Sequence, residues 1–153
     1  MLKEISIYTD GSCHPQKKIG GWAAIIQLNG ERVTLKGMVK ETTHQRMELT
    51  AALSALGYLK KNDLLKLPVD IFTDSQYLIQ IKTRSAHLVD NNYLSRHGKP
   101  IRNADLVSEL VDYLSRARID FLKVVAHQKK TSTENINRDV DRIARRIVRE
   151  HCI

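Results

Sequence analysis

One dipeptide between two strand-like segments constrains the fold of this chain more than any other feature. Asn29-Gly30 separates the apolar segment 22–28 from segment 31–39, in which apolar residues alternate with polar ones. Asn and Gly both tolerate the positive φ that a two-residue hairpin turn requires, so the two segments are predicted to pair as antiparallel strands. Residues 2–10 read as a buried strand before them. The chain is therefore expected to open with a three-stranded meander.

Helix-type and strand-type periodicities alternate after the meander. The predicted elements are a helix of about 20 residues from Thr43 with a capping box of Thr42 and Gln45, a strand at 69–74, a helix from near Ser75, an irregular polar segment at 84–102, a helix at 103–117, a strand at 119–126 and a helix at 138–151. Strands that helices separate run parallel, so strands one, four and five are predicted to be parallel. We expect one α/β domain over residues 1–153, with a five-stranded mixed sheet flanked by helices.

Charge and cysteine content narrow the possible partners. The formal net charge of +8 favours a polyanionic partner, with nucleic acid ahead of an anionic membrane. Cys13 and Cys152 are too few for a disulfide framework or a thiolate zinc site, which fits a reducing cytoplasmic setting. No apolar run approaches the roughly 20 residues that span a bilayer. We expect a cytoplasmic monomer that does not associate with membranes.

Two acidic residues follow the predicted parallel strands. Asp10 ends the first strand, before a polar loop expected at 11–21, and Asp74 ends the fourth. If these two strands are neighbours, they lie roughly 4.8 Å apart, and both side chains are expected to enter one crevice at the carboxyl ends of the strands. Like charges at that distance repel, which raises a pKa or requires a cation.

Three further carboxylates are candidates for the same crevice. Glu48 lies in the second turn of the first helix, and Asp139 and Asp141 open the last one. Residues two positions apart on a helix face different sides, so only one of the two aspartates can join. Taken singly, such residues are more often caps or turn residues. Together, oxygen ligands without cysteine select Mg²⁺ or Mn²⁺, and two such ions about 4 Å apart would clamp a phosphodiester for hydrolysis.

Five local sequences are more specific than this geometry. In chain order they are Tyr8–Cys13, Thr42–Leu49, Thr73–Tyr77, Lys99–Leu106 and Asn137–Ala144. They resemble, in the same order, the motifs of type 1 ribonucleases H. The resemblance covers nearly the whole chain and implies the ribonuclease H-like fold. It also implies an endonuclease that hydrolyses the RNA strand of RNA–DNA hybrids and leaves 5′-phosphate and 3′-hydroxyl ends.

The resemblance assigns catalytic roles to five residues. It implies a tetrad that binds two Mg²⁺ or Mn²⁺ ions, made of Asp10, Glu48, Asp74 and Asp141. Asp141 is preferred to Asp139 because the Asp-Arg-Ile-Ala run after Val140 matches the family pattern best. His127 matches the family's mobile histidine, which assists water activation or product release, and an unperturbed imidazole suits that work near neutral pH.

The resemblance also implies contacts to the hybrid. The residues concerned are Gly11, Ser12 and Cys13 through their backbone, His44, Gln45 and Gln76 through side chains that touch the hybrid, and Thr43 and Asn103 beside a DNA phosphate. Such polar groups pair with 2′-hydroxyls without reading sequence. The family commonly has Asn where this chain has His44.

Two segments depart from the family pattern. The loop 128–137, between His127 and Asp141, is longer than expected for the family. Segment 84–102 corresponds to the basic handle of some members, but it carries fewer basic residues and no tryptophan. Three alternatives stay open: a hybrid-binding module without catalysis, a related metal nuclease acting on other nucleic acids, and a domain of a reverse transcriptase polyprotein.

Overall fold

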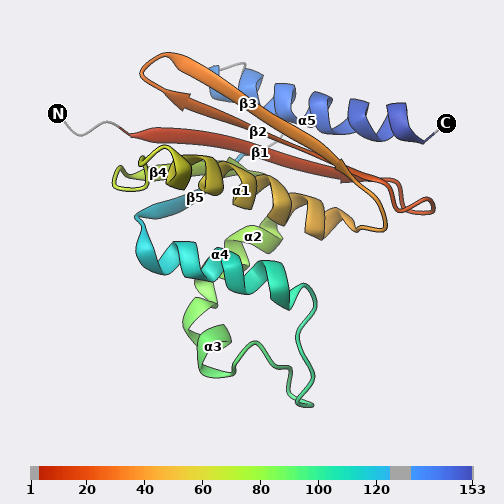
Figure 1. Ribbon diagram of the computed structural model, residues 1–153, viewed down its shortest axis with the longest axis vertical. Helices are drawn as coiled ribbons and strands as arrows, with labels where there is room; N and C mark the ends of the chain where they lie inside the picture. The colour runs from red at the N-terminus through yellow and green to blue at the C-terminus, as the bar shows by residue number, and fades with distance from the viewer. Residues whose placement is uncertain (1–3, 125–131, 153) are drawn as a thin grey trace.

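The computed structural model describes residues 4–124 and 132–152. Its strands are β1 (Ile5–Cys13), β2 (Gly20–Leu28), β3 (Glu31–Val39), β4 (Val69–Thr73) and β5 (Ile119–Lys123). Its helices are α1 (His44–Lys61), α2 (Gln76–Thr83), α3 (Ser85–Asp90), α4 (Ala104–Arg116) and α5 (Ser132–His151). The sheet order is β3-β2-β1-β4-β5, with β1 to β3 antiparallel and β1, β4 and β5 parallel (Figure 1). The predicted mixed sheet is confirmed.

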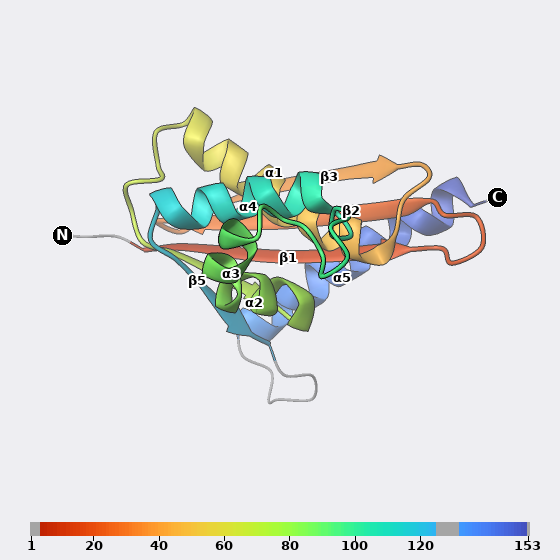
Figure 2. The same ribbon diagram turned by 90° about the horizontal axis from the view of Figure 1, so that it is seen from below.

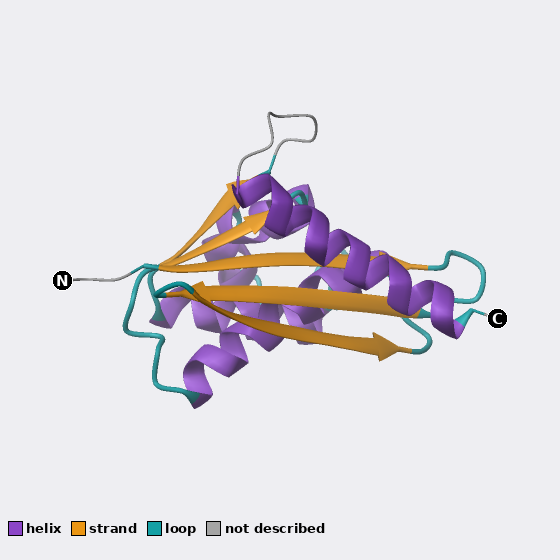
Figure 3. Cartoon of the chain, turned by 90° about the horizontal axis from the view of Figure 1, so that it is seen from above, coloured by secondary structure: helices purple, strands orange, loops and turns teal. Residues whose placement is uncertain are grey.

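Helices cover both faces of this sheet. α5 packs across β1 and β2 on one face, and Figure 3 shows it crossing in front of the strands. α1 packs on β1 and β2 from the other face, with α4 at its side (Figure 2). None of the helices in the described part of the chain is long and apolar enough to cross a membrane.

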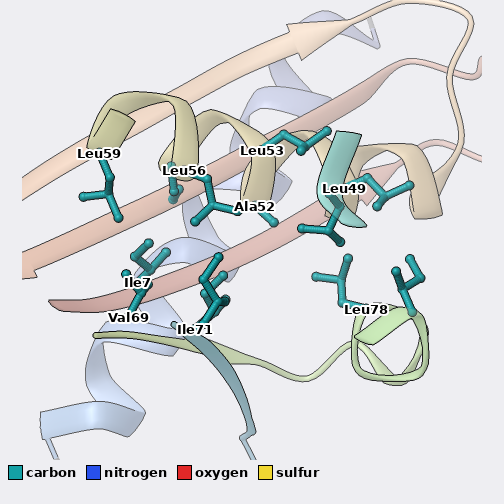
Figure 4. Packing of buried hydrophobic residues seen from close by; sticks show 14 of the residues in the cluster. Ile7, Leu49, Ala52, Leu53, Leu56, Leu59, Val69, Ile71 and Leu78 are labelled. Atoms are coloured by element: carbon teal, nitrogen blue, oxygen red, sulfur yellow. The ribbon is translucent and has the colours of Figure 1, made fainter. Parts of the chain in front are cut away.

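The larger hydrophobic core lies between the sheet and α1. Ile7 of β1 and Ile71 of β4 are fully buried there against Leu49 and Leu56 of α1 (Figure 4). Burying one such side chain contributes roughly 2 kcal/mol to folding. This packing fixes the position of α1, and therefore of Glu48, relative to the ends of β1 and β4.

A smaller core lies under α5. It contains Tyr8 and Ile25 of the sheet with Val140 of α5, and the Tyr8 ring stacks on Phe72 with ring centroids 4.7 Å apart. Side chains alternate between the faces along a strand, so β1 directs Ile7 towards α1 and Tyr8 towards α5. Two residues beyond Tyr8, Asp10 is on the α5 side.

Two glycines let the helices approach the strands closely. A Cβ on Gly11 would lie 2.7 Å from the backbone nitrogen of Glu48 and from the carbonyl carbon of Met47. On the opposite face, a Cβ on Gly21 would lie 2.6 Å from the carbonyl oxygen of Ala144. Helix backbone therefore rests almost directly on strand backbone at both points.

The hairpin prediction is confirmed, because Asn29 and Gly30 have φ of 56° and 79°. The predicted end of the first strand at Asp10 is wrong. β1 stays paired with β2 as far as Cys13, opposite Gly20, after its pairing with β4 has ended. The expected polar loop 11–21 therefore shrinks to residues 14–19.

Other differences concern element boundaries. Segment 84–102 is not wholly irregular, since it contains α3 and a β-bridge between Leu94 and Pro100. It protrudes from the body of the molecule in Figure 1. The N-cap of α1 is Thr43, whose side chain accepts from the Arg46 nitrogen, so the predicted capping box at Thr42 is wrong.

The C-terminal boundaries differ as well. β5 ends at Lys123 rather than 126, and α5 begins at Ser132 rather than 138, so part of the expected loop 128–137 is helical. His127 lies outside the described residues.

Candidate active site

Asp10 and Asp74 lie at one end of adjacent parallel strands. Asp10 is in β1 just beyond the last residue paired with β4, and Asp74 follows β4 directly. The Gly11 backbone nitrogen donates to Asp10 Oδ1 at 2.9 Å, which fixes one carboxylate oxygen. The convergence expected from strand order alone is therefore present, although β1 runs on past its acidic residue.

The electrostatics show that these carboxylates are crowded. Burial raises the pKa of Asp10 to about 8, helped by hydrogen bonding with the Asp141 side chain and by the charges of Asp74 and Asp141. Burial also raises the pKa of Asp74, together with the charge of Glu48. Buried acids that raise each other's pKa lack a compensating positive charge. The site therefore favours a bound cation.

Glu48 reaches this group from α1. The residue is 7% exposed, and its Oε1 lies 2.6 Å from His44 Nε2, one helical turn earlier. The Ser75 hydroxyl donates to its other carboxylate oxygen. The hydrogen bond to Glu48 is the main cause of the raised pKa of His44. Two side chains of different chemistry, an imidazole and a hydroxyl, therefore hold the Glu48 carboxylate in place.

α5 brings Asp141, not Asp139, to this group. Asp141 interacts with Asp10 and Asp74, and its Oδ1 accepts from Arg145 Nε at 3.0 Å. Asp139 faces away, where it pairs with Arg32 of β3 at 3.2 Å. The helical spacing predicted that only one of the two could join, and the packing of α5 selects Asp141.

The donor atoms of Asp10, Glu48, Asp74 and Asp141 are all carboxylate oxygens, the kind that hard divalent cations prefer. Within residues 4–124 and 132–152, however, no three acidic, histidine or cysteine side chains are arranged to hold one ion as they stand. Two of the carboxylates are instead engaged with Ser75, His44 and Arg145. A cation at this site would replace some of these contacts.

A polar network lies beside the carboxylates, at the start of α1 and α4. Asn103 has a left-handed backbone, and its Nδ2 donates to Tyr77 Oη at 3.1 Å and to Gln45 Oε1 at 3.5 Å. Arg46 donates to Asn103 Oδ1 at 3.4 Å and makes two bonds to Asp105, at 3.0 and 2.9 Å. Gln45 and Asn103, predicted to contact substrate, thus lie together, with Thr43 close by in sequence.

The remaining predicted contact residues are more dispersed. Ser12 and Cys13 are paired with β2, and Cys13 Sγ lies 3.5 Å from the Thr42 carbonyl oxygen. Gln76, at the first turn of α2, accepts from Lys123 Nζ at 3.2 Å. His44 contacts Glu48, so this histidine belongs to the carboxylate group as well as to the candidate binding surface.

Three residues of the site carried a signal in the sequence but no assigned role. Arg46 and Tyr77 organise the network around Asn103. Ser75 contacts Glu48 and also caps α2 through its bond from the Leu78 nitrogen. Each lies inside a recognisable motif, but only the fold shows which neighbour it contacts.

We expect Ser75→Ala to destabilise the protein by about 1 kcal/mol, because α2 loses its N-cap and buried Glu48 loses a donor. Chemical denaturation of the metal-free protein measures this. Ser85→Ala is the matched control, since that hydroxyl donates only to the Ile81 carbonyl. An effect at Ser75 no larger than at Ser85 would contradict the assigned role.

Proteins of known family resemble this chain in sequence and in fold. Residues 2–149 match the family model described as RNase H. A protein named ribonuclease H from Caldicellulosiruptor saccharolyticus is 34% identical over 151 residues, which cover 97% of this chain and 99% of that protein.

Solved structures of low sequence identity share the fold. LC9-RNase H1, described as a type 1 RNase H with the type 2 active-site motif, matches with a TM-score of 0.79 at 19% identity, over 97% of this chain and 73% of that chain. LC11-RNase H1 in complex with RNA/DNA hybrid matches with a TM-score of 0.70 at 16% identity, over 97% of this chain and 99% of that chain.

Proposed function

This chain belongs to the RNase H family, and we therefore propose that it hydrolyses the RNA strand of RNA–DNA hybrids with divalent metal ions, leaving 5′-phosphate and 3′-hydroxyl ends. The family-model match and the ribonuclease H relative confirm the resemblance that the motifs indicated. One observation carries the proposal for this particular chain. Asp10 and Asp74 are carboxylates with raised pKa values that interact with each other and with Asp141.

The residues fit a divalent cation by their chemistry. Asp10, Glu48, Asp74 and Asp141 would hold it, because they supply only hard oxygen donors and because crowding raises the pKa values of Asp10 and Asp74. When bound, two Mg²⁺ or Mn²⁺ ions would activate a water and stabilise the leaving oxygen of the phosphodiester. The protein's part is to hold four mutually repelling groups together, which the packing of α1 and α5 on β1 does.

The polar network provides the other half of the proposal. We propose that Thr43 and Asn103 bind a backbone phosphate. Arg46, which is itself paired with Asp105, donates directly to Asn103 Oδ1 and so helps to hold Asn103 in place. Gln45 and Gln76 carry amides that can pair with 2′-hydroxyls without sequence preference. LC11-RNase H1, which shares this fold, was solved with an RNA/DNA hybrid. We propose that His127 transfers protons during the reaction and so assists water activation or product release.

A substrate comparison tests the proposal. The full chain is incubated with end-labelled RNA–DNA hybrid, duplex RNA and duplex DNA of one sequence, with Mg²⁺, Mn²⁺ or EDTA. We expect cleavage of the hybrid's RNA strand only, and only with metal. Asp139→Asn is a control for the loss of one carboxylate from α5. Because Asp139 pairs with Arg32 outside the site, this variant is expected to cleave the hybrid as fast as the wild type.

Each of the other possible results would support a different function. Tight hybrid binding without cleavage under any metal would indicate a binding module. Equal cleavage of duplex DNA or duplex RNA would indicate a nuclease of different specificity. Cleavage in EDTA would exclude the metal-dependent chemistry.

A further inference from the structure

The outward side of α5 carries five arginines that the catalytic proposal does not use. We call this surface the arginine ridge: Arg138, Arg142, Arg145, Arg146 and Arg149, all of them exposed. Their spacing of four, three, one and three residues keeps them on one side of the helix. Arg145 is paired with Asp141.

The apolar side of α5 is already covered. The residues buried against the sheet are Ile136, Val140, Ala144, Ile147 and Val148. A basic amphipathic helix binds membranes by inserting its apolar side, and here that side belongs to the protein core. The ridge therefore offers charge without apolar surface, which suits a hydrophilic polyanion.

The ridge is continuous with the carboxylate group. Asp141 and all five ridge arginines line one open hollow of ≈ 350 Å³. From Arg138 to Arg149 the helix rises about 16 Å, a length over which one strand of a duplex presents roughly five phosphates. Arginine is the side chain best shaped to bind phosphate.

From these observations we propose that the arginine ridge binds the phosphate backbone of the nucleic acid whose scissile bond lies at the carboxylates. It extends the contact surface along α5, on the side of the molecule away from α4 and segment 84–102. This inference rests on the proposed function for the identity of the nucleic acid. The surface itself is a property of α5.

The test compares two triple variants that remove equal charge. Arg142→Gln/Arg146→Gln/Arg149→Gln removes three ridge arginines and keeps Arg138 and Arg145, of which Arg145 is paired with Asp141. Lys60→Gln/Lys61→Gln/Lys66→Gln is the control, because these lysines lie at and beyond the C-terminal end of α1. Fluorescence anisotropy measures the Kd for a labelled RNA–DNA hybrid in EDTA over a range of salt concentrations, and circular dichroism checks folding.

We expect the ridge variant to bind about tenfold more weakly than the wild type at 0.1 M salt, with a salt slope reduced by about two to three, since each lost phosphate contact removes about 0.9. The control variant should match the wild type. Equal losses in both variants would mean that only net charge matters, and no loss in the ridge variant would mean that α5 does not contact the strand. Either result overturns the inference.

Two outcomes distinguish the ridge from the proposed function and from a membrane-binding surface. A wild type that binds the hybrid without cleaving it, with the ridge effect intact, refutes the proposed function and leaves the ridge standing. A ridge variant that keeps its hybrid affinity but loses binding to phosphatidylserine vesicles identifies a membrane surface instead, and also overturns the inference.

Discussion

Asp10→Asn is expected to lower RNA-strand cleavage on the order of 1000-fold while making the metal-free protein more stable. The activity falls because Asp10 is a proposed metal ligand that interacts with both Asp74 and Asp141. Stability rises because the variant replaces a buried charge with a neutral side chain of the same shape. Initial cleavage rates and thermal unfolding in EDTA measure the two effects on one preparation.

The gain in stability has a definite pH dependence. The pKa of Asp10 in the folded protein is raised from 3.8 to about 8, so between these values the folded state binds more protons than the unfolded one. The contribution of Asp10 to stability is therefore fully present below pH 4 and is lost as the pH rises towards 8. The variant lacks this loss, so its advantage should grow from near zero at pH 4 to several kcal/mol at pH 8.

Divalent cations provide a separate readout of the same substitution. Mg²⁺ or Mn²⁺ should raise the Tm of the wild type at pH 8, since an ion that binds only the folded state stabilises it. The shift should be smaller for Asp10→Asn. Wild-type cleavage by the variant, or an equal metal-dependent Tm shift in both proteins, would contradict the role given to Asp10.

Gly11→Ala is expected to destabilise the protein by about 3 kcal/mol, because the new methyl group meets backbone atoms that cannot turn aside. The Cβ would lie 2.7 Å from the Glu48 nitrogen and the Met47 carbonyl carbon, so α1 must move away from β1. That movement separates Glu48 from Asp10, and a displacement of about 1 Å is expected to lower activity by about 100-fold. Urea denaturation and cleavage kinetics measure the two effects.

Gly57→Ala is the matched control within α1. A Cβ there has only the Tyr113 hydroxyl nearby, at 3.8 Å. Alanine is the better helix former, so this variant should be about 0.5–1 kcal/mol more stable with unchanged activity. If both glycine variants behave alike, close contact between α1 and β1 is not what requires Gly11.

Sequence reasoning succeeded where one local rule decides the structure. Asn29-Gly30 turns with positive φ at both residues, as the dipeptide requires. Helical and alternating periodicities located every described element except α3, and the helices between them predicted that β1 and β4 are parallel. The structure shows that the two strands are neighbours. Because that adjacency brings Asp10 near Asp74, the centre of the candidate site could be predicted from the sequence on the condition that the two strands are neighbours.

Sequence reasoning failed where a contact with a residue distant in the sequence decides the local structure. Gly11 to Cys13 look like a loop, but β2 pairs with them and extends β1. The choice of Asp141 over Asp139 needed the family pattern, because only packing on the sheet shows that Asp139 turns to Arg32. The contacts of Ser75 and Arg46 depend on how α1, α2 and α4 meet, which no local pattern records.

The docking of α5 also has a consequence for protein synthesis. The helix that supplies Asp141 is made after the whole sheet, and it packs on β1 and β2, which are synthesised before the other strands of that sheet. A nascent chain that ends before α5 would have three of the four carboxylates and an uncovered apolar surface around Tyr8 and Ile25. Such a fragment is expected to be inert towards nucleic acid and prone to aggregate, so cleavage can begin only after translation has passed this helix.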